Sequence, residues 1–426
     1  MKFRSTWILT SLLFLSAASR ARAQEAPLPN PPVRLADLLV EAEQNNPQIQ
    51  AARHGWRSAQ QVSTQVSTLP DPQFVFQHLS VGSPRPFAGY TNSDFAYVGI
   101  GISQDLPYPG KLRLRGEIAK KDADVTQQRY ETVRRAMLAE VKMAYFQLSY
   151  LAKRQTILEG NGQVLQEVEQ AAEAKYRSGM GNQQDVLQAQ LEQTKLLREI
   201  TTTELESGKL QAEIKQLLNR AQSSPDIETT ETSETLAAYT YDQLLAAATA
   251  NNPEIAGAQK LVEKQRLQVD LAKKDFYPDF NFQYMWQRTD PTQFRAYYVA
   301  TLGVRFPIYR RRRQQPELAQ AEAEQSRAKS EYETQTQQIA FLLRQQFLAA
   351  EKSAELLKIY SGGLVPQARA ELQAGMAAYQ SNRQDFQALL ASFLDVLKFD
   401  EEYWQTLSEH ETALAKIEEL TGMSLR

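Results

Sequence analysis

Cysteine is absent from the 426 residues of this sequence, which excludes several kinds of site at once. Disulfides, thiolate metal ligands and cysteine nucleophiles all need a thiol. We also expect no N-terminal lipid anchor, because acylation at that end requires a cysteine. Histidine is nearly as scarce: His54, His78 and His410 stand far apart, and no HxxxH or HExxH spacing occurs. The sequence therefore indicates no metal site and no cofactor.

Two other features are lacking: an excess of charge of one sign, and a long apolar run in the body of the chain. Basic and acidic residues number 48 and 50, for a formal net charge of -2. This balance gives no reason to expect a nucleic-acid partner, which needs a basic patch. A transmembrane helix needs about 20 consecutive apolar residues, and no stretch reaches that length. If the chain spans a membrane, it must do so as a closed β-barrel.

The first residues, 1–23, have the pattern of a signal peptide. Lys2 and Arg4 form a basic start, residues 7–15 an apolar run, and residues 21–23 an A-x-A cleavage site. The mature protein is therefore expected to be exported, in a bacterial-type cell.

The body of the chain contains an internal repeat. Residues 38–49 return as residues 244–255, and both copies carry the tripeptide Asn-Asn-Pro. We divide the chain into a first structural repeat at 24–220, an inter-repeat linker at 221–240 and a second structural repeat at 241–426.

Each repeat contains two predicted strands, in which aromatic or apolar side chains alternate with polar ones. The strands are expected at about residues 73–79, 95–102, 279–287 and 298–306. A strand with one face in lipid and the other in water has this pattern, and so does a strand of a soluble sandwich. On the membrane interpretation, three residues belong to an aromatic girdle at the membrane interface: Tyr284, Trp286 and Tyr298.

Long helices follow the strands. An apolar seam with spacings of three and four predicts a helix from about residue 111 to residue 177, on the order of 100 Å long. Return helices are expected to end near Arg220 and Leu420. Helix-breaking residues predict a bend inside the long helix of each copy. These residues are Gly160 and Gly162 in the first copy and Gly362, Gly363 and Pro366 in the second.

Four strands cannot close a membrane barrel, which begins at about eight strands. Closure therefore requires oligomerisation. The duplicated Asn-Asn-Pro helix, the strand pair and the Tyr-x-Ser-Gly turn followed by Asp185-Val186-Leu187 resemble the TolC-type outer-membrane efflux proteins. Residues 106–111 and 364–368 further resemble the heavy-metal (CzcC-like) efflux subgroup.

This resemblance implies a mostly α fold with a membrane β-barrel, built from a duplicated helix–strand–strand–long helix–helix unit. It implies a homotrimer, in which a 12-stranded barrel in outer-membrane lipid continues as an α-helical barrel through the periplasm. The function implied is the exit duct of a tripartite efflux pump or type I secretion system. Its partners would be a periplasmic adaptor protein and an inner-membrane transporter, and the duct itself would catalyse nothing.

The resemblance also places a pore aperture at the periplasmic helix tips. The residues matched to it are Asp185, Asp385, Arg383 and Tyr379. Both aspartates are expected in the first turn of a return helix, where simple helix capping is the alternative role. The tip turns are also expected to dock the adaptor, against the alternative of ordinary solvated turns. The docking residues are Tyr176, Ser178, Gly179, Gly181, Ser381 and Asn382. The second turn is expected to be the tighter, because it lacks the glycines of the first.

Two basic clusters follow the strand pairs. They are Lys111, Arg113 and Arg115 in the first copy and Arg310 to Arg313 in the second. Lipid phosphates at the periplasmic rim of the barrel are one candidate partner, and solvent is the other. The rival function for the whole chain is a soluble periplasmic coiled-coil scaffold or adaptor without a pore. An enzyme is not indicated, since no nucleophile–base set or phosphate loop occurs.

Overall fold

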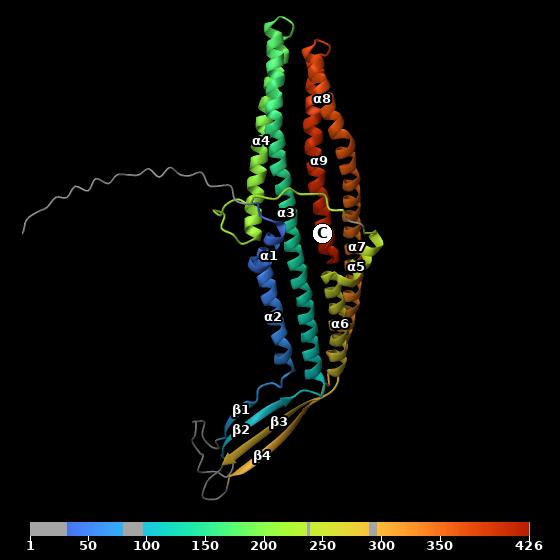
Figure 1. Cartoon of the computed structure of the whole chain (residues 1–426). Coiled ribbons are helices and arrows are strands. Elements are labelled where there is room, and N and C mark those ends of the chain that lie inside the picture. The colour runs from blue at the N-terminus through green and yellow to red at the C-terminus, as the bar shows by residue number, and fades with distance from the viewer. Residues whose placement is uncertain (1–31, 80–96, 237–238, 289–295, 426) are drawn as a thin grey trace, which may run out of the picture.

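The computed structural model describes residues 32–79, 97–236, 239–288 and 296–425 (Figure 1). The signal peptide predicted at 1–23 and the first two residues of the strand predicted at 95–102 lie outside these ranges. In the described part of the chain, no helix is both long enough and apolar enough to cross a bilayer.

The first half of the chain folds as two short helices, two strands, a very long helix and a return helix. These elements are α1 (Leu35–Asn45), α2 (Pro47–Ser67), β1 (Gln73–Leu79), β2 (Tyr97–Leu106), α3 (Lys111–Arg177) and α4 (Gln183–Leu217). The helix predicted over residues 111–177 is therefore confirmed.

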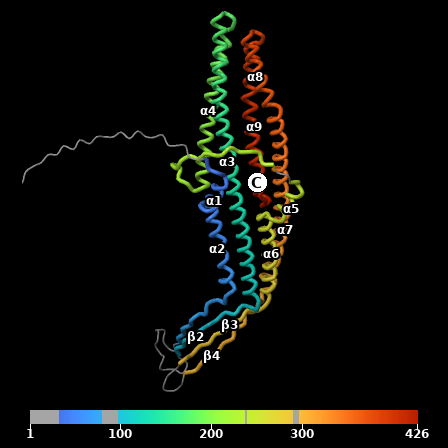
Figure 2. Tube along the Cα trace, in the orientation of Figure 1, coloured from blue at the N-terminus to red at the C-terminus, as the bar shows by residue number. Residues whose placement is uncertain are grey.

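The second half repeats this order with one interruption. Its elements are α5 (Tyr241–Asn251), α6 (Pro253–Lys274), β3 (Asp279–Arg288), β4 (Tyr297–Arg305), α7 (Gln314–Ile359), the π-helix η1 (Tyr360–Leu364), α8 (Val365–Gln380) and α9 (Phe386–Thr421). Figure 2 shows the two halves running side by side, with the four strands at one end and the two helix tips at the other. The short helices α2 and α6 begin alike, because Asn46 and Asn252 each cap a helix whose first residue is a proline.

The four strands form one antiparallel sheet in the order β1-β2-β3-β4. β2 continues to Leu106, four residues past the end predicted at residue 102. The sequence does not indicate this extension, because the consecutive polar residues Gln104 and Asp105 interrupt the alternation of apolar and polar side chains. The ladder nevertheless continues, because Asp105 pairs with Asn281 and Leu106 with Phe280.

The helices next to the sheet pack in the order α2, α3, α6 and α7, so α3 joins the two halves. Farther from the sheet, α4 packs on α3, and α9 packs on both α3 and α8. Separate buried clusters support each half near the middle of the molecule, and a third cluster joins the halves near the tips. Figure 1 shows the resulting elongated shape.

Only the second copy departs from regular α-helix at its predicted bend. Val365 N–H bonds to Tyr360 O, five residues back, and Pro366 follows in the first turn of α8. The π-turn accommodates the proline, which can neither donate a hydrogen bond nor fit behind a regular helical turn. The bend expected at Gly160 and Gly162 does not interrupt α3, which continues as an α-helix through both. Glycine costs only about 1 kcal/mol in a helix, and α3 packs against α4 there.

Candidate functional site

The first helix tip ends α3 with a Schellman turn. Gly179 has a φ of 74°, in the left-handed region that glycine adopts without strain. Met180 N–H donates to Lys175 O at 2.9 Å, and Gly179 N–H donates to Tyr176 O at 3.1 Å. These bonds satisfy carbonyls that the end of α3 leaves free, so the backbone of the turn is held rigidly.

The second tip has the same turn. Asn382 takes the left-handed position with a φ of 59°, and Arg383 N–H donates to Ala378 O at 2.8 Å. Five residues separate the helices at each tip, 178–182 and 381–385. The expectation of a tighter second turn is therefore wrong. Asparagine is among the few residues that adopt this conformation readily, so it replaces the glycine without shortening the turn.

The two candidate aperture aspartates occupy different helix positions. Asp185 lies in the first turn of α4, as predicted. Asp385 is the N-cap of α9, and its Oδ1 accepts a 2.9 Å hydrogen bond from Ala388 N–H. The placement of Asp385 within the first turn is therefore wrong by one residue. The residue that corresponds to Asp385 is Asn182, the N-cap of α4, and not Asp185.

Tyr379 is buried between the two tips. Lys175 Nζ lies 3.8 Å from the centre of the Tyr379 ring and donates to the Tyr379 carbonyl. The Phe386 ring lies 5.9 Å away, edge to face. Burial, and then the negative charge of Asp185, raises the pKa of Tyr379. Among the described residues its hydroxyl finds no hydrogen-bond partner, so Tyr379 interacts with Lys175 of the first tip through its ring and its carbonyl oxygen.

Further polar contacts join the tips around a pocket of about 580 Å³. Gln188 on α4 and Gln387 on α9 exchange side-chain amide hydrogen bonds. Asn382 Nδ2 lies 3.5 Å from Met180 Sδ. Arg383 is exposed and forms no ion pair with any other residue that the structure describes. Of the predicted aperture residues, the structure thus brings Tyr379 close to Asp185 and leaves Arg383 outside this contact.

The docking residues predicted on the turns are mainly at the surface. Tyr176, Ser178, Gly179, Ser381 and Asn382 are exposed, whereas Gly181 is half-buried against Lys175. An added Cβ at Gly181 would lie 2.9 Å from the Lys175 Cβ, so the position requires glycine.

Sequence reasoning missed three residues that join the tips: Lys175, Gln188 and Gln387. A comparison of the repeats offers one signal, because Lys175 corresponds to Ala378 in the other copy. A lysine precedes the tip tyrosine in the first copy, whereas an alanine precedes it in the second. This difference indicates that the lysine makes a contact that the second copy lacks. The glutamines carry no such signal, since glutamine is frequent throughout both return helices.

A second candidate site is the apolar face of the sheet. The register aligns its exposed side chains in rows that cross all four strands. One row runs Phe76, Ile100, Trp286, Tyr298, and the next runs Phe74, Ile102, Tyr284, Ala300. The Tyr284 and Tyr298 rings stack diagonally at 5.9 Å. All three predicted girdle residues lie on this face and are exposed, whereas Met285 and Gln287 are buried on the opposite face.

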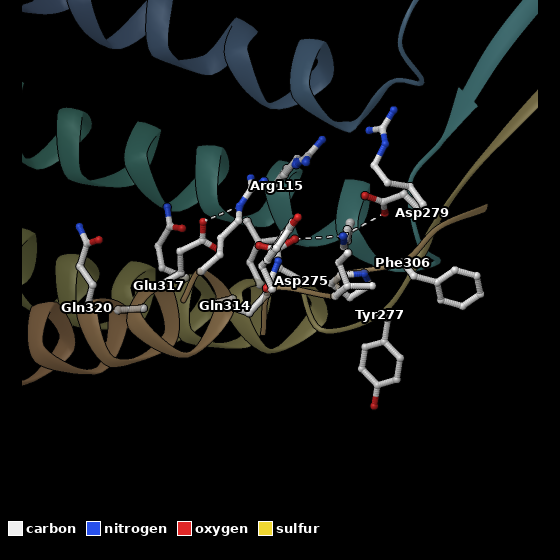
Figure 3. Close-up of a pocket in the computed structure, with 18 of the residues that line it drawn as sticks. Arg115, Asp275, Tyr277, Asp279, Phe306, Gln314, Glu317 and Gln320 are labelled. Carbon is white, nitrogen blue, oxygen red and sulfur yellow. Dashed lines mark hydrogen bonds and ion pairs between the residues drawn. The ribbon is translucent and has the colours of Figure 1, made fainter. Parts of the chain in front are cut away.

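The junction between sheet and helices holds a pocket of about 730 Å³ (Figure 3). Lys111 is its buried cation, with Nζ 3.0 Å from Asp275 Oδ1 and 2.9 Å from Asp279 Oδ1. Figure 3 shows Tyr277 and Phe306 pointing away from these ion pairs. The junction thus has a charged interior and an aromatic outside.

The sequence profile of the outer membrane efflux protein family matches residues 38–220 and 244–398, most of both halves. The chain belongs to this family. Solved structures of similar fold include the outer-membrane channel OprN, at 18% identity and a TM-score of 0.78, covering 92% of this chain and 90% of that one. Another is VceC from Vibrio cholerae, at 18% identity and a TM-score of 0.77, covering 92% and 97%.

A third solved structure is CusC, at 16% identity and a TM-score of 0.78, covering 92% of each chain. At these identities the likeness shows the fold of this efflux-family chain. No curated protein matches it.

Proposed function

We propose that three copies of this efflux-family chain form the outer-membrane exit duct of a tripartite efflux pump or type I secretion system. Three four-stranded sheets would close as a 12-stranded barrel in lipid, and the helices would continue the duct through the periplasm. The duct conducts passively, and an inner-membrane transporter supplies the energy through a periplasmic adaptor.

The apolar sheet face carries this proposal. Its rows include exposed Phe74, Trp286 and Tyr298, a composition suited to lipid contact. The outer edges of β1 and β4 have no partner strand among the described residues. An open edge strand has unpaired backbone N–H and C=O groups and therefore tends to pair with a strand of another chain. In lipid, a sheet is stable only when it closes into a barrel. Pairing of β4 with β1 of the next copy meets both requirements.

The same face argues against a soluble scaffold, the rival function. Contiguous exposed apolar patches on soluble proteins rarely exceed a few hundred Å², and this one crosses four strands. A scaffold of long helices would need no such surface.

For the cargo, we propose a heavy-metal ion, because residues 106–111 and 364–368 resemble the metal-efflux subgroup. Deletion of the gene should then lower tolerance to metal salts more than tolerance to drugs. Lower tolerance to drugs alone would refute the metal cargo and leave the duct intact.

The deciding experiment is to measure the mass and single-channel conductance of the mature protein extracted in detergent. A trimer with discrete conductance in a planar bilayer is expected. A trimer that conducts only after its adaptor is added also supports the duct, with tips that are closed at rest. A monomer that is soluble without detergent and never conducts would refute the duct and favour the scaffold.

A further inference from the structure

The two repeats build the junction between strand and long helix differently. In the first copy, Lys111 follows Pro107 by four residues, begins α3 and is 3% exposed. In the second copy, Gln314 follows Pro307 by seven residues, begins α7 and is 7% exposed. Because each is the buried first residue of its helix, Gln314 occupies the place of Lys111. The second junction therefore contains three additional residues.

The longer junction of the second copy exposes apolar side chains and arginines next to one another on the surface. We name residues 306–312 the rim segment. Its apolar members Phe306, Ile308 and Tyr309 are 65%, 75% and 68% exposed. Arg310, Arg311 and Arg312 are exposed as well, and none pairs with a carboxylate in the described parts of the chain.

Helix stability does not account for these arginines. Positive charge at a helix N-terminus is unfavourable, because it opposes the helix dipole. The neighbouring Arg313 shows the usual compensation, since its Nε lies 3.2 Å from Glu317 Oε1. The three rim arginines have no such carboxylate in the part of the chain that the structure describes, so an anionic partner outside the chain would relieve both the mutual repulsion and the unfavourable dipole interaction.

We propose that the rim segment docks on anionic phospholipid headgroups of the periplasmic leaflet, which rests on the proposed membrane function. The apolar sheet face ends at this level, so the bilayer boundary lies where the rim segment projects. Tyr309 and the apolar side chains enter the interface, and the arginines bind lipid phosphates in bidentate geometry. Tyr277 lies at the same level, 49% exposed, with Lys274 Nζ 5.6 Å from its ring centre.

Two of the three basic residues of the first cluster, Lys111 and Arg113, have carboxylate partners within the chain. Lys111 is buried between Asp275 and Asp279. Arg113 Nη1 lies 2.8 Å from Glu117 Oε1 on its own helix. The first copy therefore provides a matched control, an arginine just after the strands that already has its partner.

A neighbouring copy of the chain is a less suitable partner for the rim arginines. The first junction packs against α6 and β3 of the same chain, with its Tyr108 ring stacked on Tyr277 at 4.6 Å. It does so without the three additional residues. An equivalent contact between copies would use Ile308 and Gln314, so the arginines remain available outside it.

The test compares full-length mature wild type, the triple variant R310Q/R311Q/R312Q and the control R113Q. Each purified protein is heated in mixed micelles containing phosphatidylglycerol or phosphatidylcholine, and again with soluble glycerol 3-phosphate. Wild type and R113Q should have a higher Tm in phosphatidylglycerol. The triple variant should lose most of this difference, and glycerol 3-phosphate should not reproduce it. R310K/R311K/R312K, which keeps the charge, should retain at least half of the difference.

An equal phosphatidylglycerol shift in the triple variant would overturn the inference. So would a shift of the same size with glycerol 3-phosphate, which would indicate binding of free phosphate. Dissociation of the triple variant in lipid-free detergent would identify the segment as a contact between copies. A wild type that conducts without preferring phosphatidylglycerol refutes this inference alone, whereas one that forms no channel refutes the proposed function as well.

Discussion

Asn46 and Leu217 join the start of one helix to the end of another. Asn46 Nδ2 donates to the Leu217 carbonyl at 2.8 Å, in a buried position. The Asn46 Oδ1 accepts from the backbone N–H of Gln48 and Ile49. One side chain thereby satisfies free donors of α2 and a free acceptor of α4. In the second half, Asn252 makes the same bond to Leu420 at 3.0 Å.

Asn46→Ala should lower the stability of the protein by about 1–3 kcal/mol, because it leaves buried backbone groups unpaired. Asn46→Asp should also destabilise, since it keeps the cap and places a carboxylate against the Leu217 carbonyl. The exposed neighbour Asn45→Ala is the control. Guanidinium unfolding followed by helical circular dichroism measures the midpoints, and equal midpoints for N46A and N45A would contradict the prediction.

Asp385 caps the N-terminus of α9 and also carries a negative charge, and two substitutions distinguish these two roles. Asn caps as well as Asp, so Asp385→Asn removes only the charge, whereas Asp385→Ala also costs about 1 kcal/mol of capping. If three Asp385 carboxylates ring the aperture, both variants should reduce cation selectivity and raise leak conductance in planar bilayers. A wild-type profile for D385N together with a leak in D385A would leave capping as its only role.

Lys175 should hold the tips together through the ring and the carbonyl oxygen of Tyr379. A cation–π contact contributes about 0.5–2 kcal/mol, and Lys175→Met removes both this contact and the hydrogen bond while preserving the length of the side chain. We expect a several-fold higher open probability in single-channel records. Lys195→Met is the control, because Lys195 pairs with Glu192 on its own helix.

Tyr379→Phe tests the same contact from the other partner. The hydroxyl is buried without a partner in the described structure, and phenylalanine keeps the ring face. Its open probability should equal that of wild type. A leak as large as that of Lys175→Met would mean that the hydroxyl, not the ring, holds the tip.

Glu140 should make stability depend on pH. Burial raises its pKa above the ordinary carboxyl value of 4.5, the Lys416 charge opposes this shift, and Glu419 and Glu213 add to it. The folded state therefore binds more protons than the unfolded state above pH 4.5, and stability falls as the pH rises through the folded pKa.

Glu140→Gln should consequently raise Tm relative to wild type at pH 7 and make little difference near pH 4, where Glu140 is mostly protonated. Glu167→Gln, at an exposed position of the same helix, is the control. A Tm gain that is equal at both pH values would show that the effect is not electrostatic.

Arg383 is exposed at the second tip, where an adaptor would dock. Arg383→Glu reverses its charge and should reduce recovery of the adaptor in a pull-down. The wild-type fold should persist, because the turn is held by backbone bonds. Lys398→Glu, on α9 beyond the turn, is the control. Normal recovery with R383E would place docking elsewhere.

The sequence by itself determined the mostly helical class, the alternating strands and the full extent of α3. These features depend on periodicity and on local conformational preference, both of which can be read along the chain. It failed at the second tip turn, where the absence of glycine predicted a tighter turn. Asn382 adopts the left-handed conformation that Gly179 adopts in the first turn, so the two turns have the same length.

Only the tertiary structure decided which residues meet. Lys175 lies on Tyr379 although 204 residues separate them, and no local pattern records a pairing between two helix tips. The register of β2 on β3 likewise assembles the apolar rows from both halves of the chain. The outward position of the rim arginines follows from the burial of Gln314 in the place of Lys111. Such contacts depend on how the two repeats pack on each other, which periodicity within either repeat does not specify.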